Sequence, residues 1–327
     1  MTRETPDPQD EFWHEPLNDS PLWRESYYFD FYDEDADLAY FSSIGNRVNK
    51  GNMGSVAALV WEGTTYVRKD YSHPTVNEAI QVDGLLYEAV TPNEEWRVRH
   101  LGQINEFEPG SNALELPADE YPFRDKPLHT LDMDLHYEGI HDPVYYDPEG
   151  EAREIFSSMY HGHSDQALRV TGSVRIGDET VEIDCYGERD HSWGIRDWRD
   201  PDTWQWTTAV FDDDTAVNFW EVRKPEGTAV EGYLHLDGRS ELVADIEVTT
   251  QYREDGYTQD TFDVTVTDHE GRSLDVSAET LTVVPVNFSY DDEVTTVRRT
   301  PTRYEANGKT GHGWTEYATT LPASEMQ

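Results

Sequence analysis

The chain has 327 residues, a formal net charge of −42 and 12% aromatic residues, which fits a folded protein with a carboxylate-rich surface and argues against disorder. With 67 Asp and Glu against 25 Lys and Arg, we expect no basic patch of the kind that nucleic acid or anionic lipid requires. Only five of the cations are Lys, at positions 50, 69, 126, 224 and 309. An acidic composition poor in Lys predicts adaptation to molar salt, where screening mutes self-repulsion.

The chain shows no sequence signal for export or membrane insertion. The opening MTRETPDPQDEF lacks the apolar core of a signal peptide, and no run approaches the length of a transmembrane helix. Cys185 is the single cysteine, so no disulfide can form within the chain. We therefore expect a soluble, cytoplasmic protein without stable membrane insertion.

Residues 1–20 are polar and Pro-rich, and we interpret them as a tail that docks through Phe12 and Trp13. From Trp23 onward, apolar alternation predicts one strand after another. The predicted turns contain Gly and lie at Glu62-Gly63, Gly177-Asp178, Asp255-Gly256 and Glu270-Gly271.

Alternation is clearest where Phe262, Val264 and Val266 would point one way and the intervening residues the other. One short helix is predicted, around residues 76–82, and residues 106–150 are interpreted as an elaborated loop or irregular edge strands. The fold class is therefore all-β, with antiparallel barrels or sandwiches in two domains, residues 21–186 and 187–327.

The stretch CYGERDHSWGIRDWRD is unusually rich in charged and aromatic residues. On a strand, Arg189, His191 and Trp193 would share one face, and Asp190 and Ser192 the other. One interpretation is an ion-paired junction between two sheets, in which the arginines of three Arg-Asp dipeptides pair with the aspartates and two Trp side chains act as wedges. The paired residues are Arg189, Arg196 and Arg199 with Asp190, Asp197 and Asp200, and the wedges are Trp193 and Trp198. The other places His191 in a cavity as an acid or base, oriented by Asp190 and walled by Trp193.

Two further stretches carry groups suited to a site. In YHGHSDQ, His161 and His163 would share one face of a strand. They could bind a metal as a pair, line a cavity as polar residues together with Gln166, or belong to an exposed strand. In TGHGWTEYA, one face of a strand would present His312, Trp314 and Glu316. An aromatic wall beside Glu316 would raise the pKa of its carboxylate by desolvation. The alternative is a terminal strand with Trp314 in the core and Glu316 at the rim.

Motifs of several chemistries are missing from the sequence. It contains no G-x-G-x-x-G, G-x-S-x-G or H-E-x-x-H, which disfavours nucleotide-driven and zinc-protease chemistry.

The segment HGHSDQALRVTGSVRIGDETVEIDCYGERDHSWGIRDW, the later RYEANGKTGHGWTEYA and the early YYFDFYDEDADLAYFSSIGNRVNKGNMGS resemble one known group. They are similar to the tandem lipocalin-like superfamily that includes carotenoid hydratase (hydroxyneurosporene synthase) and AttH-type proteins. The R-D-H-S-W-G block looks like that of an uncharacterised branch, of halophilic archaeal type.

This resemblance implies two lipocalin-like β-domains side by side, with a ligand cavity between or within them. Members include cofactor-free hydratases, and related fungal proteins steer cyclisations of lipophilic substrates. The hydratase motif that lines the site maps onto Asp190, His191, Trp193 and Gly194. Where that group has a Tyr and an Asp on a following strand, this chain has Asn218 and Trp220, with Glu221 as the substitute carboxylate, which leaves the reaction open.

The leading hypothesis is an enzyme that needs no cofactor and moves a proton on a lipophilic, isoprenoid-like molecule, by hydration, isomerisation or cyclisation. The expected catalytic residues are His191, Asp190 and Glu316. The expected substrate-binding residues are Trp193, Arg189, His163, Gln166, Trp198, Trp220, Glu221, His312 and Trp314. Two alternatives are a carrier of such a molecule without catalysis and an interaction module without a small-molecule site.

Overall fold

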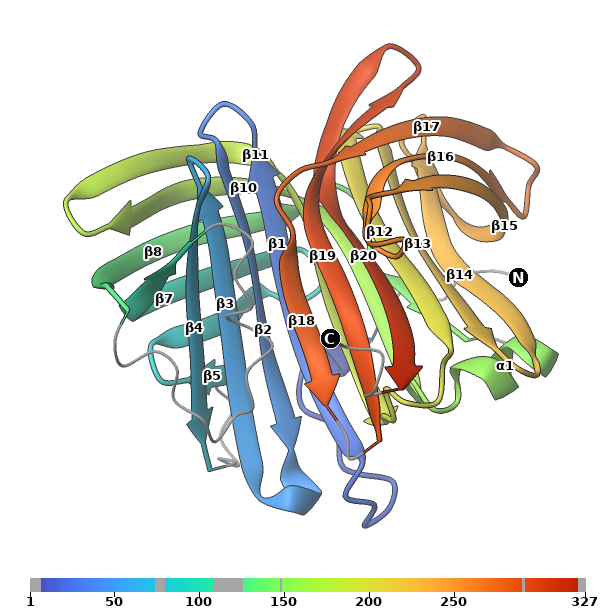
Figure 1. The fold of residues 1–327 in the computed structure, drawn as a ribbon, viewed down its shortest axis with the longest axis horizontal. Coiled ribbons are helices and arrows are strands. Elements are labelled where there is room, and N and C mark those ends of the chain that lie inside the picture. Colours follow the sequence, from blue (N-terminus) through green and yellow to red (C-terminus); the bar gives the residue numbers. More distant parts are fainter. Residues whose placement is uncertain (1–6, 74–79, 109–125, 148, 290–291, 323–327) are drawn as a thin grey trace.

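The computed structural model describes residues 7–73, 80–108, 126–147, 149–289 and 292–322, which form two antiparallel sheets standing side by side (Figure 1). The first sheet holds β1 (Trp23–Asp33), β2 (Leu38–Arg47), β3 (Asn52–Trp61), β4 (Thr64–Ser72), β5 (Ile80–Val82), β6 (Leu85–Thr91), β7 (Glu95–Phe107), β8 (Leu128–Gly139), β9 (Val144–Tyr146), β10 (Gly162–Ile176) and β11 (Glu179–Ile195).

The second sheet holds β12 (Thr203–Asp212), β13 (Thr215–Lys224), β14 (Gly227–Leu236), β15 (Arg239–Tyr252), β16 (Gln259–Asp268), β17 (Ser273–Thr280), β18 (Val284–Ser289), β19 (Glu293–Ala306) and β20 (Lys309–Pro322). The described helices are short: η1 (Pro8–Glu11), η2 (Val48–Lys50) and α1 (Gly150–Phe156). Within the described ranges, none of them has the length and apolar run that a membrane span needs.

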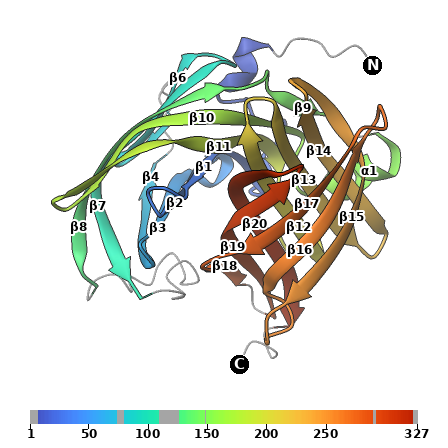
Figure 2. The same ribbon diagram turned by 90° about the horizontal axis from the view of Figure 1, so that it is seen from above.

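Each sheet curls until it meets itself, as the view from above shows (Figure 2). In the first, the order is β4-β3-β2-β1-β11-β10-β8-β7, and β4 also pairs with β7. In the second, the order is β17-β16-β15-β14-β13-β12-β20-β19, and β17 also pairs with β19. The predicted all-β fold of two antiparallel domains is thus confirmed, and barrel closure pairs most of the strand edges.

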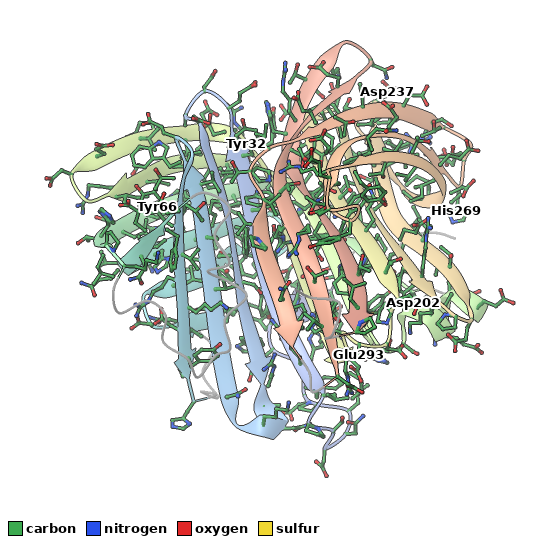
Figure 3. The ribbon with its side chains drawn as sticks, in the orientation of Figure 1. Tyr32, Tyr66, Asp202, Asp237, His269 and Glu293 are labelled. Carbon is green, nitrogen blue, oxygen red and sulfur yellow. The ribbon has the colours of Figure 1, made fainter. Side chains whose placement is uncertain are left out.

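Strand alternation separates the apolar side chains inside each barrel from those that lie between the barrels. In β1, Tyr27, Phe29 and Phe31 point into the first barrel, whereas Tyr28 and Tyr32 point outward, toward the second sheet. The outward side chains pack against Trp and Val side chains of the second sheet, and a separate cluster fills the second barrel. Tyr32 marks where the sheets meet (Figure 3), and its ring contacts the His312 ring of β20 edge-on at 5.1 Å.

The predicted turns fall between the expected strands. Glu62 and Gly63 connect β3 to β4 with positive φ angles of 47° and 76°, the backbone that a tight two-residue hairpin requires. In β16, Phe262, Val264 and Val266 are buried, as the alternation predicted.

Three expectations differ from the structure or lie partly outside it. The predicted helix at 76–82 falls mostly outside the described residues, and its end, Ile80–Val82, is strand β5. The interval 106–150 contains two regular strands, β8 and β9, and residues 109–125 of it lie outside the described ranges. The expected boundary at 186/187 falls inside β11, which pairs with β1 and β10 as far as Ile195 and Trp193 respectively, so the chain passes between sheets after Ile195.

Candidate functional site

The two faces of β11 point into different spaces. Arg189 and His191 point into the first barrel with almost no exposure, at 2% and 0%, while Asp190 and Ser192 point outward, toward the second sheet. A cavity of about 830 Å³ lies between the barrels, and Asp190 and Ser192 line it. We expected His191, Trp193 and Arg189 to line the cavity; the structure places them on the opposite face, because the cavity lies outside the first barrel.

The N-terminal segment fills part of the first barrel against these inward residues. Glu11 is fully buried and accepts two hydrogen bonds from the Arg189 guanidinium, 2.9 Å to Oε2 and 2.6 Å to Oε1. Arg189 also donates from Nε to Gln166 Oε1 at 2.6 Å. Trp13 packs edge-on against Tyr27 at 4.9 Å. The segment interpreted as a polar tail thus contributes Glu11 to a buried ion pair with Arg189 of β11.

His191 belongs to a cluster with the same segment. Its Nε2 lies 2.8 Å from Glu25 Oε1, its ring stacks on Tyr27 at 4.0 Å, and His14 Nδ1 reaches the same carboxylate oxygen at 2.9 Å. Burial favours the protonated form of Glu25, but the hydrogen bonds from the two His rings outweigh it and lower the pKa of Glu25. The ligand atoms of His14, Glu25 and His191 lie within 4.8 Å of one another, a set that suits a divalent ion, although hydrogen bonds among them already account for the geometry.

The cavity between the barrels has an aromatic lining. Outward side chains of the first barrel meet three Trp side chains of β12 and β13; the aromatic lining residues include Tyr28, Phe41, Trp204, Trp206 and Trp220. Small-molecule sites are commonly concave, mostly apolar and of about 300–1,000 Å³, and this cavity is within that range.

A chain of four polar side chains leads from this cavity into the protein. Asp190 Oδ2 lies 2.6 Å from His163 Nε2, and His163 Nδ1 lies 2.7 Å from Glu231 Oε1. The hydroxyl of Tyr160 donates to the other oxygen of Glu231. His163 and Asp190 both line the cavity, but His163 is 2% exposed and Asp190 is 15% exposed, so Asp190 is the more accessible of the two to a ligand. The metal-pair interpretation of His161 and His163 gains no support, because His161 is exposed whereas His163 is buried among these carboxylates.

The charges of these groups depend on each other. Burial alone would lower the pKa of His163, but the carboxylates of Asp165 and Asp190 raise it well above its usual value. Burial would raise the pKa of Asp190, but His163 and then Arg196 bring it below its usual value. At neutral pH the pair is therefore an imidazolium beside a carboxylate. Asp165, whose Oδ2 is 3.5 Å from His163 Nε2, completes a second set of atoms within 4.8 Å, with His163 and Asp190.

Glu316 is a second carboxylate of the cavity wall. Its Oε1 accepts a hydrogen bond of 2.7 Å from Trp204 Nε1, and its Oε2 lies 3.3 Å from Arg299 Nη2. Arg299 lies over the rings of Tyr28 and Phe41 at 4.4 and 4.6 Å. The predicted aromatic surroundings of Glu316 are present, but an arginine accompanies them.

Beneath Tyr28 lies a buried carboxylate that our sequence analysis did not identify. The hydroxyl of Tyr28 donates to Asp30 Oδ2 at 2.8 Å, and burial raises the pKa of Asp30 to about 7 despite that hydrogen bond. The signal was present in YYFDFYD, because an acidic residue inside an aromatic strand is costly to bury without a purpose.

The remaining predicted residues divide between the cavity and other places. Trp198 and Trp220 line the cavity. Glu221 pairs with Arg223, His312 pairs with Glu34, and Trp314 is buried with its Nε1 bonded to Phe31 O. Asn218 is buried and donates to Glu188 Oε1 at 3.0 Å. Gln166 lies on the barrel side of β10, with Arg189.

The Arg-Asp dipeptides do not form the junction in the predicted way. Of the three pairs of neighbours, none pairs within its own dipeptide: Asp190 pairs with His163, Asp197 with Arg199, and Asp200 with Lys224. Arg196 donates to Met159 O, Ser26 Oγ and Ser192 Oγ. Asp190 and Asp200 therefore find their partners on β10 and β13, whereas Asp197 pairs within the loop that follows β11.

Comparison with known proteins places the chain in a family. The profile of DUF7064, a domain of unknown function, matches residues 7–321. The chain belongs to the DUF7064 family. No curated protein sequence matches it.

Several solved structures share the fold of this chain. A protein of Nitrosomonas europaea assigned as AttH has 14% sequence identity and a TM-score of 0.61, with 97% of each chain covered. Kievitone hydratase from Nectria haematococca has 10% identity and a TM-score of 0.54, over 90% of this chain and 88% of that chain. CghA, solved with Sch210972, has 11% identity and a TM-score of 0.55, over 92% and 89%. The resemblance to AttH-type proteins thus extends to the fold of the whole chain.

Proposed function

We propose that the protein is a cofactor-free enzyme that moves a proton on a lipophilic small molecule held between the two barrels. Asp190 is the acid–base group of this proposal, and Glu316 is the second carboxylate that faces the substrate. The reaction class is a hydration, isomerisation or cyclisation that begins with proton transfer to or from carbon.

The observation that carries the proposal is the position of Asp190. Its carboxylate lies at the wall of a cavity lined by Trp204, Trp206 and Trp220, and a buried His163 is 2.6 Å behind it. A carboxylate that a protonated imidazole keeps ionised at an apolar surface can accept a proton from a carbon of the substrate and return it to another carbon. Positioned acid–base groups of this kind contribute about 10²–10⁴-fold to rate.

The His163–Glu231–Tyr160 part of the chain positions Asp190. Because His163 has carboxylates at both nitrogens, its ring is fixed in orientation and kept protonated. The cavity walls then hold the substrate in one shape, which supplies the rest of the rate enhancement. The named activity of kievitone hydratase, which shares the fold, is in line with this class of reaction.

The experiment uses protein purified from its own host in molar salt. Native mass spectrometry identifies a lipophilic molecule that co-purifies, and the complex is then transferred to D2O or to water labelled with oxygen-18. Deuterium in non-exchangeable positions of the recovered molecule, with oxygen-18 if the reaction is hydration, supports an enzyme. A bound molecule that gains neither label over many hours indicates a carrier, and a protein without any bound or bindable lipophile contradicts the proposal.

A further inference from the structure

The charge of the cavity is opposite to that of the protein. The chain has 25 Lys and Arg against 67 Asp and Glu, yet seven Lys and Arg but only three Asp and Glu line the cavity. A solvated acidic surface would not produce this reversal. It indicates that the cavity is arranged for a group of negative charge.

Part of this charge is already compensated within the wall. Arg199 pairs with Asp197, and Arg299 lies 3.3 Å from Glu316, while Asp190 pairs with His163. Four other cations come from β1, β2, η2 and the segment after β11; we call them the cationic group, which consists of Arg24, Arg47, Lys50 and Arg196.

Arg24 is the member whose geometry points most directly to a missing anion. Its Nε is buried without a hydrogen-bond partner, and across the described residues no carboxylate forms an ion pair with Arg24 or Arg47. Its guanidinium lies against Gly45, where an added Cβ would be only 2.7 Å from Nη2. The glycine therefore leaves the space that the Arg24 guanidinium occupies at the cavity wall.

Arg196 holds the other side of the group with neutral partners. Its three hydrogen bonds go to Met159 O, Ser26 Oγ and Ser192 Oγ, at 3.0, 3.0 and 2.8 Å. These bonds fix the guanidinium but leave its charge unbalanced, apart from the influence of Asp190. A guanidinium that is positioned and not neutralised is the form that recognises carboxylate or phosphate oxygens.

The cations also oppose one another. Burial, followed by the charges of Arg47 and Arg196, lowers the pKa of Arg24 to about 9, and burial lowers the pKa of Arg196 to about 10. Both remain protonated at neutral pH, so the folded protein keeps like charges close together in a partly enclosed space. A bound anion would relieve this repulsion, and one of its oxygens would accept a hydrogen bond from Arg24 Nε.

One wall of the cavity is aromatic. Trp198 stacks on Phe288 with ring centres 5.5 Å apart, and Trp204 and Trp206 continue this surface toward Trp220. A ligand that satisfies both regions has an apolar body and one charged end.

We infer that the cavity binds a lipophilic molecule that carries a carboxylate or a phosphate, with Arg24, Arg47 and Arg196 around its oxygens and the Trp side chains around its body. This inference deepens the proposed function and rests on it. It also locates the reacting atoms, because Arg196 and Asp190 share Ser192, whose Oγ accepts from Arg196 and donates to Asp190 Oδ1 at 3.3 Å. The carbon that exchanges a proton with Asp190 is thus near the charged end of the ligand.

The test measures quenching of tryptophan fluorescence in molar KCl with two matched pairs of probes. Laurate is compared with 1-dodecanol, and farnesyl phosphate with farnesol, so that each anion differs from its neutral partner only in the head. Because charge-assisted hydrogen bonds to a ligand head are worth more than neutral ones, we expect at least one anion to bind about tenfold more tightly than its alcohol. The pair that shows the larger preference identifies the head as carboxylate or phosphate, and either result supports the inference.

The variants assign the preference to the cationic group. Arg24→Gln and Arg47→Gln should each remove most of the preference for the anion and leave the affinity for the alcohol unchanged. Arg97→Gln is the control, because Arg97 pairs with Asp134 on the first barrel and does not line the cavity. Arg47 is only partly buried, so its variant keeps the test valid if Arg24→Gln does not fold.

Two results would overturn the inference, and they differ in what else they affect. Equal affinity for anion and alcohol, unchanged in the Arg24 and Arg47 variants, shows a cavity for neutral lipophiles and leaves the proposed function intact. Failure of all four probes to quench the cavity Trp residues contradicts the proposed function as well.

Discussion

Asp190 and Asp165 are directly opposite each other in the β10–β11 register, and His163 lies between their carboxylates, 2.6 Å from one and 3.5 Å from the other. Two buried carboxylates at this spacing would repel, and one would take up a proton. The imidazolium of His163 keeps Asp190 ionised at the cavity wall, so the chemistry that we propose for Asp190 depends on His163.

His163→Gln should therefore destabilise the fold. The substitution leaves Asp165, Asp190 and Glu231 buried without their shared cation, and breaking a buried ion pair costs about 3–5 kcal/mol. Urea unfolding followed by circular dichroism measures the loss. The matched control is His136→Gln, since His136 is half exposed beside Glu95 on the first barrel. Equal stability of the two variants would show that His163 does not hold these charges.

The same pair predicts a pH window. The neighbouring carboxylates raise the pKa of His163 in the folded protein. The contribution of His163 to the free energy of unfolding is therefore complete below the unfolded pKa of about 6.5 and is lost as the pH rises through the folded pKa. The pKa of Asp190 is lowered in the folded protein. The contribution of Asp190 to the free energy of unfolding is therefore complete above the unfolded pKa of about 3.9 and is lost as the pH falls through the folded pKa. The stability advantage of the wild type over His163→Gln should be greatest between these limits and shrink at alkaline pH. An advantage that grows steadily up to pH 10 would contradict the assignment.

The buried pair of Glu11 and Arg189 predicts that the N-terminal segment is part of the first barrel. Glu11→Gln leaves a buried guanidinium, 2% exposed, without its counter-charge, and should lower the free energy of unfolding by about 3 kcal/mol. Glu15→Gln, four residues away and exposed, should change it by less than about 0.5 kcal/mol. Similar melting temperatures for the two variants would show that the segment is only loosely docked.

Salt dependence tests the expectation from composition. With 67 acidic against 25 basic side chains, self-repulsion grows when the Debye length rises to about 30 Å in 0.01 M salt. We expect circular dichroism to report loss of structure on dialysis from molar to millimolar KCl. Because sucrose does not screen charge, it should not replace KCl at equal osmolarity. Unchanged melting across this range would contradict adaptation to high salt.

The fold was readable from the sequence because strand alternation and turn residues are local signals. Gly63 and the buried Val264 are positions whose roles follow from their neighbours alone. Closure of the sheets was not readable in this way, because the pairing of β4 with β7 joins Thr65 to Phe107, far apart in the chain.

The candidate site was predictable in place but not in detail. Alternation correctly separates His191 from Asp190, yet only the position of the second barrel decides which face meets the cavity. Nothing local predicts that Glu11 reaches Arg189, or that Glu231 reaches His163, since each contact joins segments that the topology brings together.

The central claim is that Asp190, on the cavity face of β11, moves the proton. The direct measurement is deuterium uptake in D2O by the molecule that co-purifies with the protein, per folded protein, in wild type, Asp190→Asn and His191→Ala. We predict that Asp190→Asn keeps the ligand bound but loses uptake by at least about a hundredfold. His191→Ala should lower stability and retain the rate, because its ring packs on Tyr27 inside the first barrel. Full uptake by Asp190→Asn, or its loss in folded His191→Ala alone, would contradict the account.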